Sequence, residues 1–243
     1  MDVYVPRVSR EIEADIRRPA IVVCPGGGYA FCSEREAEPI ALRFLAEGFN
    51  VYVVWYRVGD RPDDEDRGHD ASNWYQKSPD HIFPLPQHDA AAAIAYVRAH
   101  AQEHHTDPDR IAVMGFSAGG HLAASYCTLR NREEIAAHIT PPDLAGAVLC
   151  YPVITADPAL RHTGSFQGLT GEEEVSSESI AAFSLERHVR KGVTPPTFLW
   201  HTAADGAVPV ENSLLYASAL SREKIPFALH VFPEGGHGLA TAD

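Results

Sequence analysis

Short apolar runs recur along this chain, and most of them are apolar at every position rather than at every second one. This pattern is typical of strands that are buried on both faces of a sheet. β-Branched residues are frequent in the runs, as expected for strands. The runs predict strands at residues 20–24, 50–56, 110–116, 145–151, 196–202 and 226–232.

Segments with helical patterning lie between these strands. Ser33 and Glu36 form the S-x-x-E pattern of a capping box, which predicts the start of the first helix. Strands that alternate with helices favour a mostly parallel sheet with right-handed crossovers, so the predicted fold class is α/β. The predicted helices cover residues 36–47, 88–104, 118–130 and 210–223.

Two long segments interrupt the alternation. Residues 57–87 are polar and rich in proline, and residues 152–195 are irregular apart from a short helical piece near 176–188. Loops of this length in a compact domain are usually functional or disordered. Both follow predicted strands, so they should emerge at the carboxyl edge of the sheet, where open α/β folds bind ligands. Residues 1–243 contain no repeat and no low-complexity linker, and they predict a single domain with these two excursions near its ligand site.

Composition narrows the classes of partner. A net charge of −13 argues against nucleic acid or an anionic membrane as the main partner. No apolar run reaches the roughly 18 residues of a membrane helix, and the first residues lack the apolar core of a secretory signal. We therefore predict a cytoplasmic protein. A homo-oligomer formed through an open sheet edge stays an alternative to a monomer.

Neither the cysteines nor the histidines predict a metal. The spacing of Cys24, Cys32, Cys127 and Cys150 suits no disulfide framework and no zinc site, so they are predicted to be reduced thiols in or near the core. Two histidines among residues 100–105 have the i, i+4 spacing of metal ligands, but no acidic third ligand is nearby. The polar end of a helix is the favoured interpretation.

The sequence GFSAG at residues 115–119 follows a predicted strand and opens a predicted helix. G-x-S-x-G occurs by chance, but between a strand and a helix it has the context of a nucleophile elbow. Such a turn holds Ser117 in a strained conformation, so Gly115 and Gly119 keep side chains out of its way. Ala118 would offer its backbone N–H to an oxyanion.

A serine hydroxyl is a weak nucleophile and needs a base and a group that orients the base. In this architecture the three follow in the order Ser, Asp or Glu, His. Asp205 and His237 each lie in a loop after a predicted strand, and His237 has glycine on both sides. As alternatives, Asp205 caps a helix or a turn, and His237 is an ordinary surface histidine.

The sequence CPGGGY at residues 24–29 also follows a strand. Three glycines in succession expose bare backbone N–H groups, as an oxyanion-hole loop requires. A phosphate-binding loop is disfavoured because no G-K-[ST] follows, and no G-x-G-x-x-G opens a helix here. No cofactor is predicted.

Taken in order, these four elements resemble the α/β-hydrolase superfamily. More narrowly, the chain is similar to small bacterial acetyl esterases and bifunctional feruloyl and acetyl xylan esterases. Besides GFSAGG, the glycine loop followed by SEREAEP is the most specific part of the likeness. The segments that carry it are 25–59, 115–124, 151–154, 195–220 and 232–238.

The resemblance implies a catalytic triad of Ser117, Asp205 and His237. It also implies an oxyanion hole made by the backbone N–H groups of Ala118, Gly27 and Gly28. The implied activity is hydrolysis of small-molecule esters of short acyl groups, acetyl above all, through an acyl-enzyme. Where this family has an acidic pair the chain has Ala204 before Asp205, but Asp205 keeps the H-x-x-x-D-x-x-V-P register.

The alcohol half of the substrate is predicted to be a carbohydrate such as a xylo-oligosaccharide. The two excursions carry Trp74, Tyr75, His162 and Phe166 among many polar residues, and aromatic faces beside polar groups suit a sugar ring. As an alternative, Trp74 and Tyr75 anchor their excursion to the rest of the protein.

Two other functions stay open. A serine peptidase of the prolyl-oligopeptidase type has the same elbow and triad order, but it usually has a large additional N-terminal domain. A ligand-binding protein with this fold and no activity would have lost a catalytic residue, and here all three candidates are present.

Overall fold

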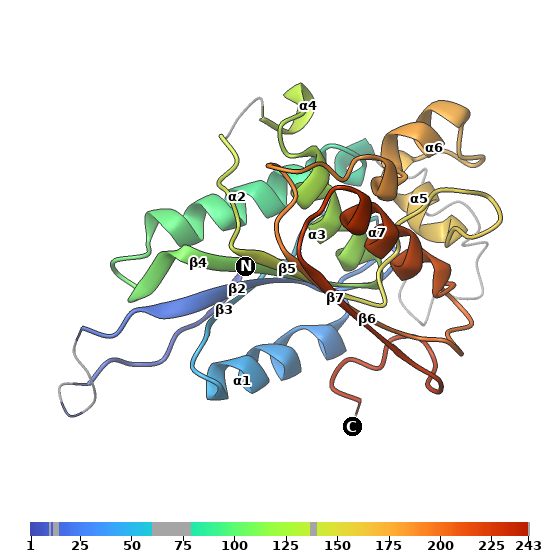
Figure 1. Ribbon diagram of the computed structural model, residues 1–243. Coiled ribbons are helices and arrows are strands. Elements are labelled where there is room, and N and C mark those ends of the chain that lie inside the picture. Colours follow the sequence, from blue (N-terminus) through green and yellow to red (C-terminus); the bar gives the residue numbers. More distant parts are fainter. Residues whose placement is uncertain (10, 12–14, 60–78, 137–139, 243) are drawn as a thin grey trace, which may run out of the picture.

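A mostly parallel β-sheet runs through the middle of the molecule (Figure 1). This computed structural model describes residues 1–9, 11, 15–59, 79–136 and 140–242. The strands are β1 (Asp2–Tyr4), β2 (Arg18–Cys24), β3 (Asn50–Val53), β4 (Thr106–Phe116), β5 (Gly146–Cys150), β6 (Thr197–Thr202) and β7 (Phe227–Phe232).

The strands form a 7-stranded sheet in the order β1-β3-β2-β4-β5-β6-β7. Strand β1 pairs antiparallel with β3, and the other neighbouring strands pair in parallel. The predicted α/β class and every predicted strand are therefore confirmed. The sheet edges are β1 and β7, and pairing of an edge with a second copy stays a prediction.

The predicted helices are confirmed with shifted boundaries. Helix α2 starts before the predicted residue 88, because a proline in its first turn needs no partner for a backbone N–H. Helix α5 was not predicted. The described helices are η1 (Glu34–Glu36), α1 (Glu38–Ala46), η4 (Pro79–His81), α2 (Leu85–Ala99), α3 (Ser117–Leu129), α4 (Glu133–Ala136), α5 (Thr163–Thr170), α6 (Ser177–Phe183), η5 (Leu185–Arg187) and α7 (Glu211–Arg222).

The predicted capping box at residues 33–36 is wrong. The Ser33 side chain makes no capping hydrogen bond, and residues 34–36 form the short 3-10 helix η1 instead of the first turn of α1. The carboxylate of Glu36 accepts a hydrogen bond from the N–H of Gly26, at 2.7 Å from Oε2. The side chain thus bonds to the glycine loop rather than to its own helix.

Helices cover both faces of the sheet, α1 on one and α2, α3 and α7 on the other (Figure 1). Successive side chains of a strand point to opposite faces, and here each face has its own core. In β2, Val22 and Cys24 join the core under α2 and α3, while Ile21 and Val23 join the core under α1. Burial on both faces explains why the inner strands β2 and β3 are apolar at nearly every position, whereas the edge strand β7 is largely exposed.

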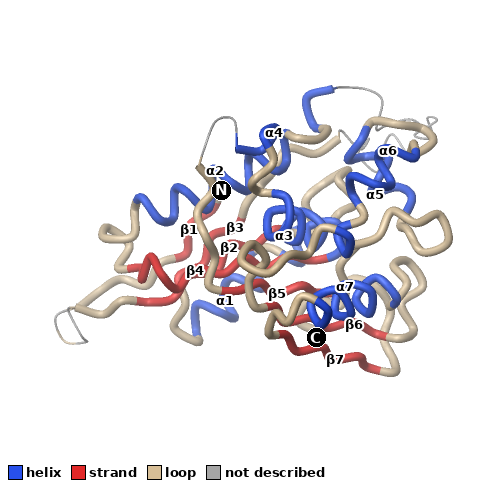
Figure 2. The backbone as a smooth tube through the Cα atoms, turned by 45° about the horizontal axis from the view of Figure 1, so that its top comes forward, coloured by secondary structure: helices blue, strands red, loops and turns tan. Residues whose placement is uncertain are grey.

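The excursion at residues 152–195 carries α5, α6 and η5. Helices α5 and α6 lie beside each other on the side of the sheet that carries α3 and α7 (Figures 1 and 2). The excursion bonds to the body through Asn212 of α7, whose Oδ1 accepts the N–H groups of Ile154 and Thr155 at 2.9 and 3.0 Å. Most of the other excursion, residues 60–78, lies outside the described residues.

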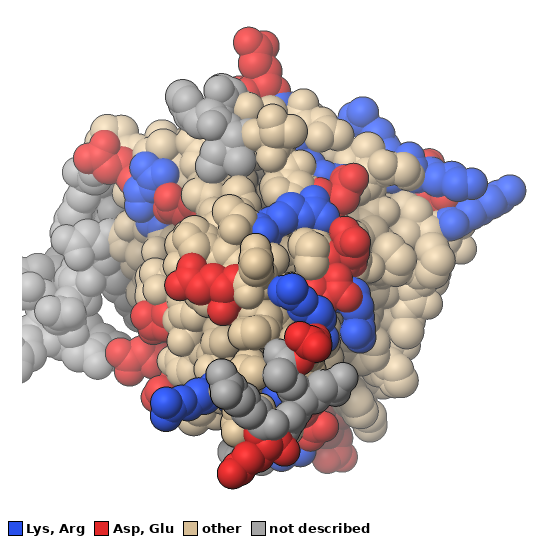
Figure 3. Space-filling view, turned by 90° about the vertical axis from the view of Figure 1, so that its left-hand side faces the viewer, with Lys and Arg blue, Asp and Glu red and all other residues tan. Residues whose placement is uncertain are grey.

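Acidic and basic side chains are interspersed over the face of the molecule that Figure 3 shows. This arrangement gives that face no broad basic area of the kind that binds nucleic acid. Among the described residues, no helix combines the length and the apolar composition needed to cross a bilayer.

The turn from β4 into α3 brings three backbone segments close together: the end of β4, the first turn of α3 and the end of β2. A Cβ atom on Gly115 would overlap the carbonyl group of Gly119 across the turn. A Cβ on Gly119 would overlap the carbonyl oxygens of Cys24 and Pro25, which end β2 and begin the glycine loop. Glycine at both positions therefore lets α3 start directly against the end of β2.

We expect Gly119→Ala to lower the melting temperature by several degrees, because overpacking of this kind costs about 1–3 kcal/mol and each kcal/mol corresponds to roughly 2–4 °C in a chain of this size. Differential scanning calorimetry measures the change. Gly206→Ala is the matched control, since a Cβ there meets no atom within 4 Å. Equal melting temperatures for the two variants would contradict the close contact.

Candidate active site

Ser117 occupies a strained backbone conformation at the start of α3. Its φ angle is 53°, in the left-handed region that residues with a Cβ rarely adopt. The carbonyl oxygen of Ser117 accepts the N–H of Val153 at 3.0 Å, which helps to fix the turn. Strain of this kind is maintained by the surrounding packing, and it is common at active sites.

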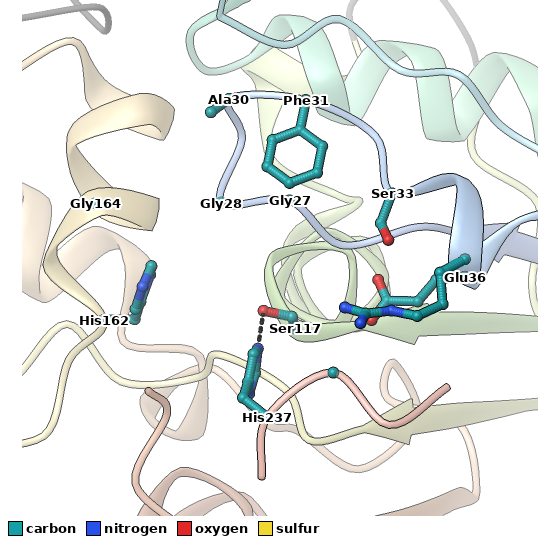
Figure 4. A pocket seen from close by; sticks show the side chains of 12 residues that line it. Gly27, Gly28, Ala30, Phe31, Ser33, Glu36, Ser117, His162, Gly164 and His237 are labelled. Atoms are coloured by element: carbon teal, nitrogen blue, oxygen red, sulfur yellow. Dashed lines mark hydrogen bonds between the residues drawn. The ribbon is translucent and has the colours of Figure 1, made fainter. Parts of the chain in front are cut away.

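The side chains of Ser117, His237 and Asp205 form one hydrogen-bonded chain. His237 Nε2 lies 2.8 Å from Ser117 Oγ (Figure 4), and His237 Nδ1 lies 2.7 Å from Asp205 Oδ2. Ser117 begins α3 directly after β4, and Asp205 and His237 lie in the loops after β6 and β7, so the parallel strands bring all three to one edge of the sheet. The sequence-predicted trio is therefore in contact.

The hydrogen-bond partners of His237 define its tautomer, that is, which ring nitrogen carries the hydrogen in the neutral ring. A carboxylate can only accept, so Nδ1 carries the hydrogen in the bond to Asp205. In the neutral ring, Nε2 is then an acceptor and faces the Ser117 hydroxyl, which donates to it. The imidazole ring is 24% exposed at its side chain, whereas the Asp205 side chain is 1% exposed. The arrangement can accept a proton from the serine and stabilise the resulting imidazolium with a buried negative charge.

Asp205 is held by four donors. Oδ2 accepts from His201 Nε2 at 3.2 Å as well as from His237, and Oδ1 accepts the N–H groups of Ala207 and Val208, both at 2.9 Å. Burial alone would raise the pKa of Asp205, but the hydrogen bonds from His201, His237 and the two amides outweigh it and hold the pKa well below its usual value. Capping of a turn and contact with His237 are thus combined in one carboxylate.

His201 is a second, fully buried histidine on Asp205. Its Nε2 also lies 3.0 Å from the carbonyl oxygen of Val208, so Nε2 carries the hydrogen. Nδ1 accepts from the hydroxyl of Ser213 at 2.8 Å. Sequence reasoning missed this role, although the H-x-x-x-D spacing of His201 and Asp205 was visible.

The glycine loop presents free amides next to Ser117. Glu36 and Ser33 occupy the N–H and C=O groups of Gly26, and the carbonyl of Gly27 accepts from Ala30 and Phe31. The N–H groups of Gly27 and Gly28 donate to no described residue. Ala118 lies in the first turn of α3, where backbone N–H groups have no partner within the helix. These amides can receive an oxyanion.

A cavity of about 440 Å³ opens over this site. In Figure 4, Phe31 stands over the cavity, with Ser117 and His237 below it and His162 across from them. A groove of about 650 Å³ lies elsewhere, between α1 and the sheet, and its lining is mostly apolar. Chemistry rather than size distinguishes the smaller cavity. It is lined by Gly27, Gly28, Ala30, Phe31, Ser33, Arg35, Glu36, Ser117, His162, Gly164, His237 and Gly238.

Of the predicted substrate-binding residues, His162 lines the cavity. It caps α5 and its Nδ1 accepts the N–H of Ser165 at 3.3 Å, so its hydrogen is on Nε2 when the ring is neutral. Burial lowers the pKa of His162, and electrostatic repulsion from His237 lowers it further, while Asp205 partly opposes both effects. The lowered pKa favours the neutral ring of His162.

Phe166, which was predicted to contact the substrate, is not among the residues that line the cavity. Its side chain is 1% exposed and its ring packs edge-on against His121 at a centroid distance of 5.3 Å. One helical turn separates it from His162, and α5 turns its apolar side into the core. Trp74 and Tyr75 lie outside the described residues.

All four cysteines are free, as predicted. Cys24, Cys127 and Cys150 are buried and Cys32 is partly buried. Burial raises the pKa of Cys32 and of Cys127 to about 12, so neither is a ready nucleophile. Within the described part of the chain, no group of three or more His, Cys, Asp or Glu residues could hold a metal ion.

A parallel sheet in this order, a nucleophile-type turn after a central strand, and an acid and a histidine after later strands define the α/β-hydrolase class. Comparison with known proteins places the chain within it. The family model described as BD-FAE matches residues 71–220, and the chain belongs to the BD-FAE family.

Relatives agree with this placement. The chain is 37% identical over 234 residues to a protein named endo-1,4-beta-xylanase B from Butyrivibrio fibrisolvens, with 94% of this chain covered. It is 30% identical over 224 residues to an acetylxylan esterase from Xylanibacter ruminicola, with 90% of this chain covered. The chain spans only 34% and 40% of the lengths of these two proteins.

Among solved structures, an acetyl ester-xyloside bifunctional hydrolase from Caldicellulosiruptor lactoaceticus has a TM-score of 0.79 and 36% identity, over 99% of this chain and 79% of that one. The carboxylesterase Cest-2923 from Lactobacillus plantarum also has a TM-score of 0.79, with 29% identity over 99% of this chain and 80% of that one. The resemblance drawn from the sequence is therefore confirmed.

The hydrogen bonds at Asp205 lead to a pH-dependent prediction. We expect Asp205→Asn to lower the free energy of unfolding at pH 7 by about 1–3 kcal/mol, because an amide leaves buried donors without an acceptor. A carboxyl group whose pKa is lower in the folded state stabilises the fold above its unfolded pKa of about 4, and this contribution is lost as the pH falls through the folded pKa. The difference between wild type and variant should therefore narrow below about pH 4.

Urea denaturation at pH 7 and at a series of lower pH values measures this difference. Glu234→Gln, which changes an exposed carboxyl three residues before His237, is the control and should leave stability unchanged. Equal stability of wild type and Asp205→Asn at pH 7 would contradict the role assigned to these bonds.

Proposed function

We propose that this protein hydrolyses carboxylic esters with Ser117 as nucleophile, His237 as general base and acid, and Asp205 as the group that orients His237. The observation that carries the proposal is the unbroken chain of hydrogen bonds from Ser117 Oγ through His237 to Asp205, at 2.8 and 2.7 Å. The relatives named as esterases support the same reaction class.

Each step uses groups described above. Ser117 Oγ attacks the ester carbonyl carbon while its proton passes to His237 Nε2. The carbonyl oxygen becomes an oxyanion, which the N–H groups of Ala118, Gly27 and Gly28 receive. The tetrahedral intermediate then expels the alcohol, which takes the proton from His237, and leaves an acyl-Ser117 ester. Water, deprotonated by His237, then attacks the carbonyl carbon of the acyl-Ser117 ester. The second tetrahedral intermediate expels Ser117 Oγ, which takes the proton back from His237, and the carboxylic acid is released.

For the substrate, we propose short acyl esters, acetyl first, on a carbohydrate. One relative is named acetylxylan esterase, and another is named acetyl ester-xyloside bifunctional hydrolase. The cavity lining supports a polar alcohol, since the polar side chains of Ser33, Arg35 and His162 line it together with the aromatic ring of Phe31. A long acyl chain would favour a continuous apolar lining, and polar side chains interrupt the lining that the described residues form.

We expect Ser117→Ala and His237→Asn each to lower kcat for p-nitrophenyl acetate by about 10⁴-fold or more, because triad members act as a unit. The absorbance of released p-nitrophenolate measures the loss of activity, and circular dichroism checks that both variants fold. Aminoacyl p-nitroanilides serve as the peptidase comparison. Cleavage of the anilides faster than the acetate would favour the peptidase alternative, and Ser117→Ala with more than a hundredth of wild-type activity would exclude Ser117 as nucleophile.

We expect kcat/KM to be higher for acetylated xylo-oligosaccharides than for p-nitrophenyl octanoate by at least about tenfold, because a cavity with both polar and aromatic lining side chains receives a sugar better than a long alkyl chain. Competition between the two esters in one reaction gives the ratio directly. Preference for the octanoate would refute the carbohydrate substrate and leave the ester hydrolase proposal intact.

A further inference from the structure

One buried carboxylate joins the two loops that flank Ser117. Glu36 is 2% exposed, and both of its carboxylate oxygens accept hydrogen bonds. Oε2 accepts the N–H of Gly26 at 2.7 Å, and Oε1 accepts the phenolic O–H of Tyr151 at 2.7 Å. No ion pair to Glu36 occurs among the described residues, so these two donors are its recorded polar partners.

The Gly26 end of this connection touches the nucleophile. A Cβ placed on Gly26 would meet Glu36 Oε2 at 2.6 Å and Ser117 Cβ at 3.0 Å, so Gly26 lies close to both the carboxylate and the serine. Glu36 accepts the hydrogen bond from the Gly26 N–H, whereas the N–H groups of Gly27 and Gly28 donate to no described residue. Gly27 and Gly28 line the cavity, whereas the N–H of Gly26 is bonded to the carboxylate.

The Tyr151 end touches the histidine loop. Tyr151 is 2% exposed and follows β5, in a left-handed conformation with φ of 36°. Its oxygen accepts the N–H of Ala240 at 3.0 Å, three residues after His237. Its ring packs edge-on against the imidazole of His237, at a centroid distance of 5.1 Å and an angle of 70° between the planes.

The four groups form one buried series, Gly26 to Glu36 to Tyr151 to Ala240. The series links the amides that would receive the oxyanion with the loop that carries the base. Neither Glu36 nor Tyr151 is part of the proposed proton-transfer chain. Burial, together with the negative charge of Glu36 and its hydrogen bond, raises the pKa of Tyr151, so the phenol stays protonated and keeps donating.

We propose that Glu36 and Tyr151 are positioning residues that together fix the glycine loop and the His237 loop on either side of Ser117. This inference rests on the proposed function. Reacting groups must be held in place before charge develops, and loss of one oxyanion donor costs about 10²–10³ in kcat in other hydrolases. Loosening of the loops should therefore affect the transition state more than substrate binding.

Two conservative substitutions test the link. Glu36→Gln can present its one oxygen to Gly26, but its NH₂ group then faces Tyr151 and can only donate to the phenol oxygen, so the phenol O–H loses its acceptor. Tyr151→Phe keeps the ring and removes the hydroxyl that joins Glu36 to Ala240. We expect each variant to lower kcat for p-nitrophenyl acetate by about 10–100-fold with KM changed less than threefold, since only transition-state contacts weaken.

The double variant separates a shared role from two independent ones. Because both changes remove the hydrogen bond from the Tyr151 O–H to the Glu36 carboxylate, we expect the Glu36→Gln/Tyr151→Phe double variant to lose little more than either single variant. Reaction with a p-nitrophenyl phosphonate, whose oxygen occupies the oxyanion position, should slow in parallel with kcat, and mass spectrometry of the Ser117 adduct measures it.

Matched controls identify a merely structural effect. Tyr126→Phe removes an equally buried hydroxyl, which donates to the carbonyl oxygen of Pro142 at 2.7 Å away from the site, and Glu34→Gln changes an exposed carboxyl in the same 3-10 helix. Both should keep wild-type kcat. Should Glu36→Gln fail to fold, Tyr151→Phe alone still tests the connection.

The inference is overturned if Tyr151→Phe keeps kcat within threefold of wild type, if the two losses multiply in the double variant, or if Tyr126→Phe loses as much activity at equal melting temperature. Wild-type activity that survives Ser117→Ala would refute the proposed function instead. The two failures are therefore distinguishable.

Discussion

Close contact between the start of α3 and the end of β2 is the constraint on which the rest of the site depends. Gly119 lies against the carbonyl oxygens of Cys24 and Pro25, and these two residues lead directly into the glycine loop. The same contact therefore fixes where Ser117 stands and where the free amides of Gly27 and Gly28 begin. A larger residue at position 119 would separate the nucleophile-type turn from the loop that faces it.

Two buried carboxylates near that contact, Asp205 and Glu36, differ in the hydrogen-bond donors that surround them. Asp205 gathers donors from two histidines and two amides of its own loop, and it directs His237 toward Ser117. Glu36 has one donor from each neighbouring loop and holds backbone in place. Both carboxylates thus join separate loops, Asp205 through the imidazole of His237, and Glu36 through the N–H of Gly26 and the phenol of Tyr151.

Sequence reasoning identified the mostly parallel sheet and the trio of Ser117, Asp205 and His237, because each rests on a local signal. Apolar runs mark strands, and small residues mark the turn around Ser117. It did not identify Glu36, because S-x-x-E at residues 33–36 has an equally good local explanation as a cap. Nothing local distinguishes that cap from a bond to Gly26, ten residues away. Phe166 was misplaced for a similar reason, since the phase of α5 depends on how the excursion packs against His121.

Burial of the four native thiols has a practical consequence for labelling. Cys24, Cys127 and Cys150 are buried, and the raised pKa of about 12 at Cys32 keeps that thiol protonated at neutral pH. A cysteine introduced at an exposed position beside the cavity, such as Glu34, would be the one thiolate readily available to a maleimide dye. The wild-type background can thus carry a single fluorophore at the mouth of the site without prior removal of its own cysteines.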